Sequence, residues 1–196
     1  MTMPKKKTNL GGLNILLGVS GGVAAYKAID LASKLCACGA NVKTVMTENA
    51  CQLVGPKSLE AITASPVFTS LWGQPEGHKI SHINLVDWAD IVIVAPATAN
   101  IIGKIANGIC DDLRSTVLCA CWAKPTLLAP AMNDNMWSNP AVQRNVKRAK
   151  EMGFILTGPE AGRLACGAEG IGRMSEPQDI LDAIEKMASK IKRKKR

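Results

Sequence analysis

Residues 14–26 read Asn-Ile-Leu-Leu-Gly-Val-Ser-Gly-Gly-Val-Ala-Ala-Tyr and decide the fold class. The first part, 14–18, is an apolar run without polar alternation, which is typical of a strand buried on both faces of a parallel sheet. A glycine-rich turn follows, and residues 25–36 then place apolar side chains on one stripe of a helix that ends at Gly39. A strand, a glycine loop and a helix in this order point backbone N–H groups toward an anion. The stretch therefore predicts an α/β fold with a phosphate site, and a tight turn needed only for packing is the alternative.

The glycine loop differs from two common nucleotide-binding motifs. Its glycines do not have the G-x-G-x-x-G spacing of dinucleotide-binding folds, and it lacks the Gly-Lys-Ser/Thr ending of a P-loop. A second predicted strand, 42–46, leads into Thr47, Glu48 and Asn49. A dinucleotide enzyme usually presents an acidic residue at this strand end to the ribose hydroxyls, whereas Thr47 and Asn49 offer neutral hydrogen bonds. The pattern therefore indicates a mononucleotide-like ligand rather than NAD.

The most apolar strand is predicted at 91–95 and is expected to be central. It leads into Pro-Ala-Thr-Ala-Asn at 96–100 and then into a helix over 101–106. Thr98 and Asn100 stand at the N-terminal end of that helix, where such side chains cap the helix or contact a ligand. Small and neutral polar groups therefore follow this strand as well.

A further strand end carries a polar residue between two methionines. The strand predicted at 126–129 stops at Pro130, and Met132, Asn133 and Met136 follow at once. Ligands of open α/β sheets bind outside the carboxyl ends of the strands. An amide between methionines suits a site for a flat apolar ring and a polar group, and a turn with core-filling methionines is the alternative.

Two other segments contain candidate catalytic side chains. His82 precedes a short apolar alternation at 83–85, and a lone histidine is more often structural than catalytic. Residues 162–174 contain four glycines and Cys166, and because such a glycine density resists helix and strand alike, they predict a mobile flap. Elsewhere, the apolar periodicity predicts helices over 56–64, 111–123, 139–152 and 177–191 and a strand over 154–157.

Length and composition limit the possible classes. The chain has 196 residues, of which 47% are hydrophobic, so one α/β domain over 13–188 is expected. No apolar run has the length of a membrane span and no signal-like segment follows the N-terminus, so a cytoplasmic protein without a membrane partner is expected. The formal charge of +8 is concentrated in the two ends of the chain, and the body is nearly neutral. Segments 1–12 and 189–196 are therefore expected to be flexible basic tails without a nucleic-acid partner, with binding to nucleic acid or to an anionic membrane as the alternative.

The seven cysteines do not predict a metal site or disulfides. Cys36 and Cys38 lie in one predicted helix, and Cys119 and Cys121 in another. Residues two apart do not share a helix face, and only two histidines could assist them. Free cysteines, packed as small apolar residues in a reducing compartment, are therefore expected, with Cys166 as the exception.

Four motifs, in this order along the chain, resemble those of the homo-oligomeric flavin-containing cysteine decarboxylases. They are Gly-Val-Ser-Gly-Gly-Val-Ala-Ala-Tyr at 18–26, His82 before Ile-x-Leu, Ala-Pro-Ala-Thr-Ala-Asn at 95–100, and Pro-Ala-Met-Asn-x-x-Met-Trp at 130–137. The resemblance covers residues 13–188 and implies FMN that is bound without covalent attachment. It agrees with the α/β three-layer sandwich with a mostly parallel sheet, flavodoxin-like or Rossmann-like, that the strands and helices predict.

The resemblance also implies how FMN is held. The flavin phosphate is expected near Ser20 and the loop residues Gly22, Val23 and Ala24, with Thr47 and Asn49 nearby. The residues expected to face the flavin are Thr98, Ala99, Asn100, Ile101, Ala131 and Met132. In the family the site lies between the subunits of a homo-oligomer, which is a trimer or a dodecamer built from trimers.

For the coenzyme A branch of the family, the resemblance implies decarboxylation of 4′-phosphopantothenoylcysteine to 4′-phosphopantetheine. The substrate thiol is oxidised to a thioaldehyde by hydride transfer to FMN, CO₂ leaves, and the hydride then returns. His82 is expected to assist the oxidation near the substrate carboxylate, Asn133 to hold that carboxylate, and Cys166 to donate the final proton. The flap residues expected to clamp the substrate are Gly167, Gly172, Arg173 and Met174.

Three other functions are alternatives. Peptide-modifying relatives stop at the oxidised enethiol of a peptide's C-terminal cysteine, but the complete Ala-Cys-Gly-Ala-Glu-Gly-Ile-Gly-Arg-Met segment at 165–174 favours the coenzyme A branch. A non-catalytic flavin-binding regulator would not need His82, Asn133 and Cys166 together, and a prenylated-flavin synthase would not explain the motif at 130–137. Many bacterial relatives are fused to the ligase that makes their substrate, and the basic C-terminal end favours a stand-alone protein over a piece of such a fusion.

Overall fold

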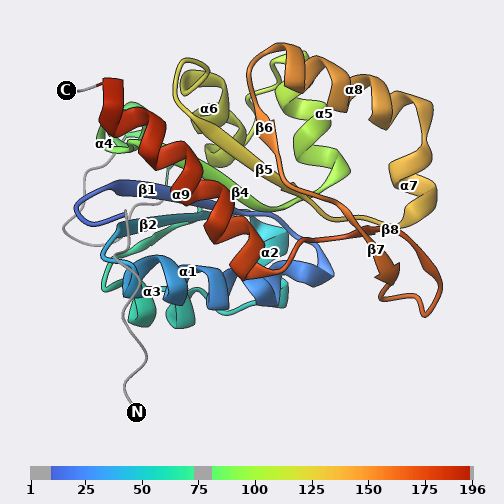
Figure 1. Cartoon of the computed structure of the whole chain (residues 1–196), viewed down its shortest axis with the longest axis horizontal. Helices are drawn as coiled ribbons and strands as arrows, with labels where there is room; N and C mark the ends of the chain where they lie inside the picture. The colour runs from blue at the N-terminus through green and yellow to red at the C-terminus, as the bar shows by residue number, and fades with distance from the viewer. Residues whose placement is uncertain (1–9, 73–80, 195–196) are drawn as a thin grey trace.

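A parallel sheet between two layers of helices organises the chain (Figure 1). The computed structural model describes residues 10–72 and 81–194. From one edge to the other, the strands are β3 (Val67–Phe68), β2 (Asn41–Met46), β1 (Asn14–Val19), β4 (Ile91–Ala97), β5 (Thr126–Pro130) and β6 (Ile155–Leu156). This is the Rossmann order of doubly wound sheets, in which the strand order reverses between β1 and β4. The predicted three-layer α/β sandwich, flavodoxin-like or Rossmann-like, is confirmed.

Helices cover both faces of the sheet. The α1 face carries α1 (Lys27–Ala37), α3 (Pro56–Thr63) and α9 (Pro177–Lys194), and the α6 face carries α4 (His82–Trp88), α5 (Ala99–Asn107), α6 (Leu113–Ala120) and α8 (Pro140–Glu151). Neighbouring residues of β1 belong to different cores, Leu17 to the α1 face and Leu16 to the α6 face. Because both faces need apolar side chains, the strands have the continuous apolar runs that predicted them. Full burial of one such leucine contributes about 1.5–3 kcal/mol.

Two short helices begin within a few residues of strand ends, and the sequence analysis missed both. α2 (Glu48–Leu53) follows β2, and the Thr47 hydroxyl caps it by accepting a hydrogen bond from the Ala50 N–H at 3.2 Å. α7 (Asp134–Ser138) follows β5 and is capped by Asn133. Both helices are too short for the apolar periodicity by which longer helices are recognised.

The segment that begins at His82 is a helix rather than the expected apolar alternation. Ser81 caps α4, because its hydroxyl accepts a hydrogen bond from the Asn84 N–H at 3.2 Å. Leu85 is buried in the core, whereas Ile83 is exposed. The apolar run after His82 was too short to separate a strand period from a helix period.

A hairpin follows β6, which corrects the expectation that dense glycines prevent strand formation there. β7 (Glu160–Arg163) pairs antiparallel with β8 (Glu169–Arg173). The Met132 N–H donates a hydrogen bond to the Gly172 carbonyl oxygen at 2.9 Å, and a side chain at Gly172 would place its Cβ 2.1 Å from the Met132 carbonyl oxygen. The glycine is therefore required by the close approach of the hairpin to the chain that follows β5.

The described chain extends beyond the expected domain at 13–188. Leu10 is fully buried in the core of the α1 face, and α9 continues to Lys194. Residues 1–9 and 195–196 of the expected tails lie outside the described residues.

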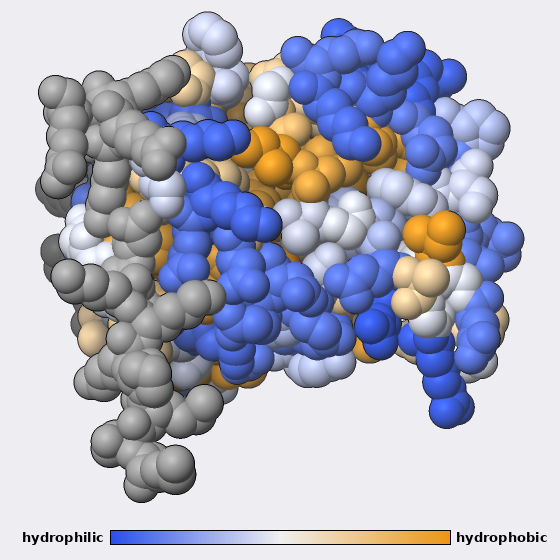
Figure 2. Space-filling view, in the orientation of Figure 1, coloured by the Kyte–Doolittle hydropathy of each residue, from blue (hydrophilic) through white to orange (hydrophobic). Residues whose placement is uncertain are grey.

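The surface is polar over much of the face that carries α9. Figure 2 shows hydrophilic side chains along α9 and an apolar strip between α9 and α8. Within the described ranges, no helix is both long enough and apolar enough to cross a bilayer. The same part of the chain contains no group of three or more His, Cys, Asp or Glu that could hold a metal ion, and its seven cysteines are free.

Candidate functional site

A cavity of about 1190 Å³ opens at the carboxyl ends of β1, β2, β4 and β5. Open α/β sheets bind ligands at this position, and the volume exceeds the roughly 300–1,000 Å³ typical of a pocket for one small ligand. The predicted site residues that line it are Ser20, Gly22, Val23, Ala24, Thr47, Asn49, Thr98, Ala99, Asn100, Ala131, Met132, Asn133, Cys166, Gly172, Arg173 and Met174. The cavity thus brings together residues from strand ends and from the hairpin.

The glycine loop after β1 lets three strand ends approach one another. A Cβ on Gly21 would lie 2.4 Å from Asn49 Cβ, and one on Gly22 would lie 3.3 Å from Thr98 Cγ2. Glycine is therefore needed at 21, where α2 contacts the loop, and a side chain at 22 would be crowded by the start of α5. Gly22 precedes a short 3₁₀ helix, η1 (Val23–Tyr26), that no side chain caps and whose first residues border the cavity. Uncapped N–H groups at such a helix start suit an anionic ligand.

Ser20 is buried and connects the end of β1 to the end of β4. Its hydroxyl donates a hydrogen bond to the Pro96 carbonyl oxygen and accepts one from the Thr98 N–H at 3.4 Å. Thr98 is the N-cap residue of α5, and its own side chain makes no capping hydrogen bond. Ser20 therefore fixes the loop, while the Thr98 side chain stands at the cavity wall without a capping role.

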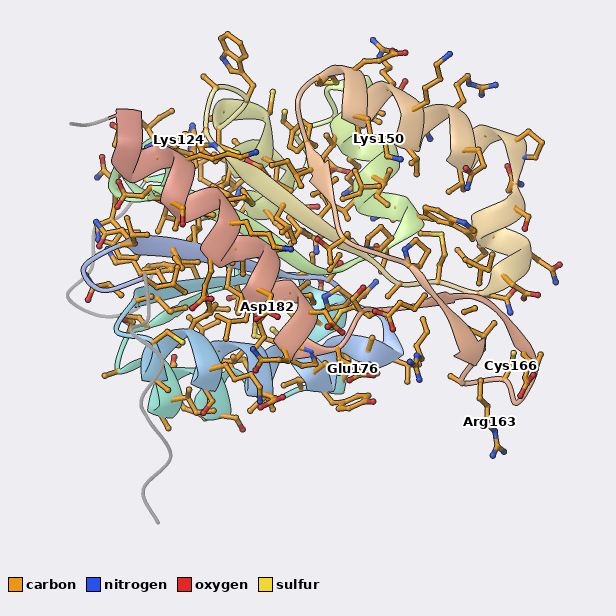
Figure 3. All side chains as sticks on the ribbon, in the orientation of Figure 1. Lys124, Lys150, Arg163, Cys166, Glu176 and Asp182 are labelled. Carbon is orange, nitrogen blue, oxygen red and sulfur yellow. The ribbon has the colours of Figure 1, made fainter. Side chains whose placement is uncertain are left out.

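Asn133 and Cys166 meet at the cavity although they come from different elements. The Asn133 Nδ2 donates a hydrogen bond to the Cys166 Sγ at 3.6 Å. The orientation of the amide is set at its other end, because Asn133 Oδ1 accepts a hydrogen bond from the Asn135 N–H at 2.9 Å. Figure 3 shows Cys166 on the hairpin together with Arg163. The residues expected to hold a carboxylate and to donate a proton thus lie side by side.

The base of the hairpin is attached to α1 through a buried lysine. Lys27 Nζ donates hydrogen bonds to the Met174 carbonyl oxygen at 3.1 Å and to Glu176 Oε1 at 2.8 Å. Glu176 stands directly before α9 (Figure 3), and its Oε1 lies 3.8 Å from Arg173 Nη2. Met174 is itself buried in the core of the α1 face. Met174 is therefore anchored at the border of the cavity, and Arg173 stands next to it.

A charged cluster that the sequence analysis missed lies on the α5 and α6 side of the cavity. Lys104 Nζ lies 2.6 Å from Asp111 Oδ1 and 2.6 Å from Asp112 Oδ2. Burial alone would raise the pKa of Asp112, but hydrogen bonds from Lys104 and from the Ser115 N–H outweigh it, so this pKa is lowered. The cluster joins the start of α6 to α5.

Arg114 is a further cavity residue that the sequence analysis missed. It lies in α6, lines the cavity and is only 2% exposed. Burial lowers the pKa of Arg114 to about 10, and the negative charge of Asp112 offsets part of the shift. In the sequence it is a single arginine in the helix Leu-Arg-Ser-Thr-Val-Leu-Cys-Ala. A charged residue in such a helix usually lies on the solvated face, so its burial was not expected.

Among the described residues, three predicted site residues do not line the cavity. Ile101 is fully buried in the core of the α6 face. Gly167 lies in the hairpin turn, with a φ of 88° that favours glycine. His82 is the first residue of α4 and is half-buried. The cavity of a single chain therefore contains Asn133 and Cys166 but not the predicted histidine.

Comparison with known sequences identifies related proteins. The matching protein-family description is Flavoprotein, over residues 3–189. The coenzyme A biosynthesis bifunctional protein CoaBC of Bacillus subtilis (strain 168) is 49% identical over 177 residues, which are 90% of this chain and 43% of the relative. The chain therefore spans less than half the length of this relative.

Two solved structures share the fold over almost their whole length. A PPC decarboxylase variant complexed with pantothenoylaminoethenethiol has a TM-score of 0.81 and 35% identity, and the match covers 89% of this chain and 97% of that chain. The FMN-dependent cysteine decarboxylase SpaF has a TM-score of 0.77 and 33% identity, and the match covers 93% of this chain and 98% of that chain.

Proposed function

Because this chain belongs to the flavoprotein family, we propose that it binds FMN and decarboxylates 4′-phosphopantothenoylcysteine to 4′-phosphopantetheine, a step of coenzyme A biosynthesis. The observation that carries the proposal is the contact of Asn133 with Cys166 at a cavity on the strand ends. The similarity to CoaBC and to PPC decarboxylase supports this substrate.

The residues around the cavity fit FMN. The uncapped start of η1 and the glycines before it offer an anion site for the phosphate, with Thr47 and Asn49 on the neighbouring strand end. A side chain at Gly21 would collide with Asn49, and one at Gly22 would crowd the Thr98 methyl group. The remaining residues, which suit a flat ring because they are small or flexible, are Thr98, Ala99, Asn100, Ala131 and Met132.

The chain's own residues position the substrate and its protons. When bound, FMN would accept the hydride of the thiol-bearing carbon, so that loss of CO₂ gives an ene-thiolate instead of an unstabilised carbanion. The Asn133 Nδ2 group donates to the substrate carboxylate, and because an amide carries no charge, it orients this group without the ion pair that would oppose its loss. The Cys166 thiol, next to Asn133, donates the proton that completes the reduced product.

The complete site requires a second copy of the chain. The exposed apolar side chains of Val23, Tyr26, Trp72 and Met136 all border the cavity, and large exposed apolar groups at a site mark a surface that a partner covers. His82 lies outside the cavity of its own chain. A homo-oligomer, a trimer or a dodecamer of trimers, in which His82 of one subunit completes the cavity of the next, accounts for both observations.

Mixed oligomers test this arrangement. His82→Asn and Cys166→Ser should each lack normal turnover alone, but oligomers refolded from a mixture should regain it, because some cavities then combine an intact Cys166 with an intact His82. Each variant refolded alone is the control. If mixing restores nothing, His82 acts within its own chain or has no role.

Product analysis tests the reaction. The purified protein should have the visible spectrum of bound flavin and should convert 4′-phosphopantothenoylcysteine to 4′-phosphopantetheine. Cys166→Ser should still release CO₂ but accumulate a product that is lighter by two hydrogens, whereas Cys119→Ser, which removes an exposed thiol outside the cavity, should behave as the wild type. A fully reduced product from Cys166→Ser would remove Cys166 from the mechanism.

The second candidate is oxidative decarboxylation of a peptide's C-terminal cysteine, for which the similarity to SpaF, an FMN-dependent cysteine decarboxylase, gives weaker support than the similarity to CoaBC and PPC decarboxylase gives to the first candidate. A wild-type protein that is inert on 4′-phosphopantothenoylcysteine but releases CO₂ from such a peptide would establish it. In either case, a chain rich in free thiols is expected to work in the reducing cytoplasm.

A further inference from the structure

A buried cation with unsatisfied donors lines the wall of the cavity. Arg114 is 2% exposed, and its Nε and Nη1 have no hydrogen-bond partner among the residues that the structure describes. A buried group that lacks its hydrogen bond costs about 1–3 kcal/mol, and more when it is charged. Because Arg114 borders the cavity, a bound ligand can supply the missing acceptor.

The nearby carboxylates are already engaged elsewhere. Asp112 accepts hydrogen bonds from the Ser115 N–H at 2.8 Å and from Lys104 Nζ at 2.6 Å. Asp111 lies 2.6 Å from the same Lys104 nitrogen. Asp112 therefore lowers the electrostatic cost of the Arg114 charge without satisfying its donors, and with a pKa of about 10 the guanidinium remains a cation at neutral pH.

Gly18 makes room for this arginine. A Cβ on Gly18 would lie 3.3 Å from Arg114 Cδ and 3.5 Å from its Cγ. Gly18 pairs in the sheet with Val45 and Val94, and both valines belong to the core of the α6 face. The stem of Arg114 therefore runs along the α6 face of β1, directly before the glycine loop.

The proposed phosphate site lies toward the other face of the sheet. Its two helices, η1 and α2, contribute Ala25 and Ala50 to the core of the α1 face. Arg114 enters the cavity from the α6 face instead. The placement of Arg114 therefore suits a part of the flavin other than its phosphate.

We infer that Arg114 is a flavin-binding residue whose guanidinium donates a hydrogen bond to an oxygen of the ring system of FMN. The inference rests on the proposed function, because it requires FMN in this cavity. The ring gains electron density on reduction, and a cation beside it in a poorly solvated site favours the reduced form. Arg114 thereby orients the ring and raises its reduction potential, which favours oxidation of the substrate thiol.

The test compares Arg114→Met and Arg114→Lys with Arg144→Met, a control that removes an exposed charge from α8. Binding of FMN and of riboflavin to the apoprotein is measured by quenching of flavin fluorescence, and the potential of bound FMN is measured against a reference dye. R114M removes a buried charge whose Nε and Nη1 have no hydrogen-bond partner among the described residues, so thermal unfolding of the R114M apoprotein should show a stable fold.

The expected result is a loss of flavin affinity that is the same with and without the flavin phosphate. R114M should weaken binding of FMN and of riboflavin by the same factor, about tenfold, since a hydrogen bond to a charged group is lost. The reduced form should lose about tenfold more affinity than the oxidised form, which lowers the two-electron potential by about 30 mV. R114K should restore part of the potential, and Gly18→Ala, which presses on the arginine stem, should lower it by less than R114M.

Other outcomes overturn the inference. Unchanged affinity and potential in R114M, with normal FMN binding by the wild type, would remove Arg114 from flavin binding and leave the proposed function intact. If R114M lost affinity for FMN but not for riboflavin, the guanidinium would bind the phosphate. If it lost affinity only for the substrate, the guanidinium would bind the substrate. A wild-type protein that takes up no FMN would overturn the proposed function and this inference with it.

Discussion

The cavity has two walls that are built differently. The strand-end wall, made by the residues that follow β1, β2, β4 and β5, is continuous with the core: Ser20 is buried and bonded to the end of β4. The hairpin wall, β7 and β8 with the turn between them, carries exposed side chains, among them Cys166. It is attached at its base, through the backbone hydrogen bond from Met132 to Gly172 and through the Asn133–Cys166 contact.

This difference separates two tasks within one site. The strand-end wall is positioned by the same packing that stabilises the sheet, so it is suited to a cofactor that stays bound. The hairpin wall has little core of its own, so its geometry depends on a few contacts, and it is suited to a substrate that enters and leaves. Changes in one wall should therefore affect cofactor and substrate unequally.

The largest effect is expected from Gly21→Ala, which breaks the strand-end wall. The added Cβ would lie 2.4 Å from Asn49 Cβ and 2.9 Å from the Asn49 carbonyl carbon, so backbone has to move. We expect FMN affinity to fall by about 100-fold, measured by fluorescence titration. Gly55→Ala, where nothing lies within 4 Å of the added Cβ, is the control. Unchanged affinity would show that this wall is not rigid.

A smaller effect, on substrate rather than on cofactor, is expected from Gly172→Ala. Its Cβ would lie 2.1 Å from the Met132 carbonyl oxygen, which displaces β8 from the chain after β5. We expect kcat/KM for the proposed substrate to fall by about tenfold or more while FMN binding stays close to that of the wild type. An equal loss of FMN would mean that the two walls form one unit.

Lys27→Met tests how strongly the base of the hairpin wall is attached to the core. The substitution leaves the Met174 carbonyl oxygen and the Glu176 carboxylate without the lysine that bonds both. We expect the free energy of unfolding to fall by about 1–3 kcal/mol in urea titrations. Lys34→Met, which removes an exposed pair with Asp30, should cost at most about 0.5 kcal/mol. Similar losses in both variants would contradict a structural role for the Lys27 contacts.

The smallest effect is expected from Thr44→Val, because Thr44 lies in β2 but does not itself line the cavity. The Thr44 hydroxyl is buried without a hydrogen-bond partner among the described residues. Valine keeps the shape and removes the unsatisfied group, so the free energy of unfolding should rise by about 1 kcal/mol. FMN affinity and turnover should not change, and a loss of either would show that a change inside the sheet alters the structure of the strand-end wall or the hairpin wall.

The strand-end wall was largely predictable from the sequence, because its signals are local. The apolar runs of β1, β4 and β5 specify buried parallel strands, and the ends of such strands meet at one edge of the sheet. Short apolar runs carried less information, which is why the helix after His82 was expected to be an alternating segment. Capping by Thr47 and Asn133 is a local signal that could have identified α2 and α7.

The hairpin wall and Arg114 were not predictable, because their meaning depends on distant residues. Gly172 is required in β8 because Met132 lies against it, and the sequence around Gly172 gives no sign of that distant contact. Arg114 has the sequence signature of a solvated side chain, and its burial depends on the absence of a side chain at Gly18. The completion of the site by His82 of a second subunit stays a prediction, because a single chain does not contain the contact between subunits.

Helix α9 has a practical consequence for handling the protein. It starts at the base of the hairpin and runs for 18 residues, which is about 27 Å, so that it ends on the side of the molecule remote from β7 and β8 (Figure 1). An affinity tag or a tether to a sensor chip attached after Lys194 would therefore project away from the cavity entrance. Immobilised protein would keep this entrance open to the solution, which suits surface-based measurements of ligand binding.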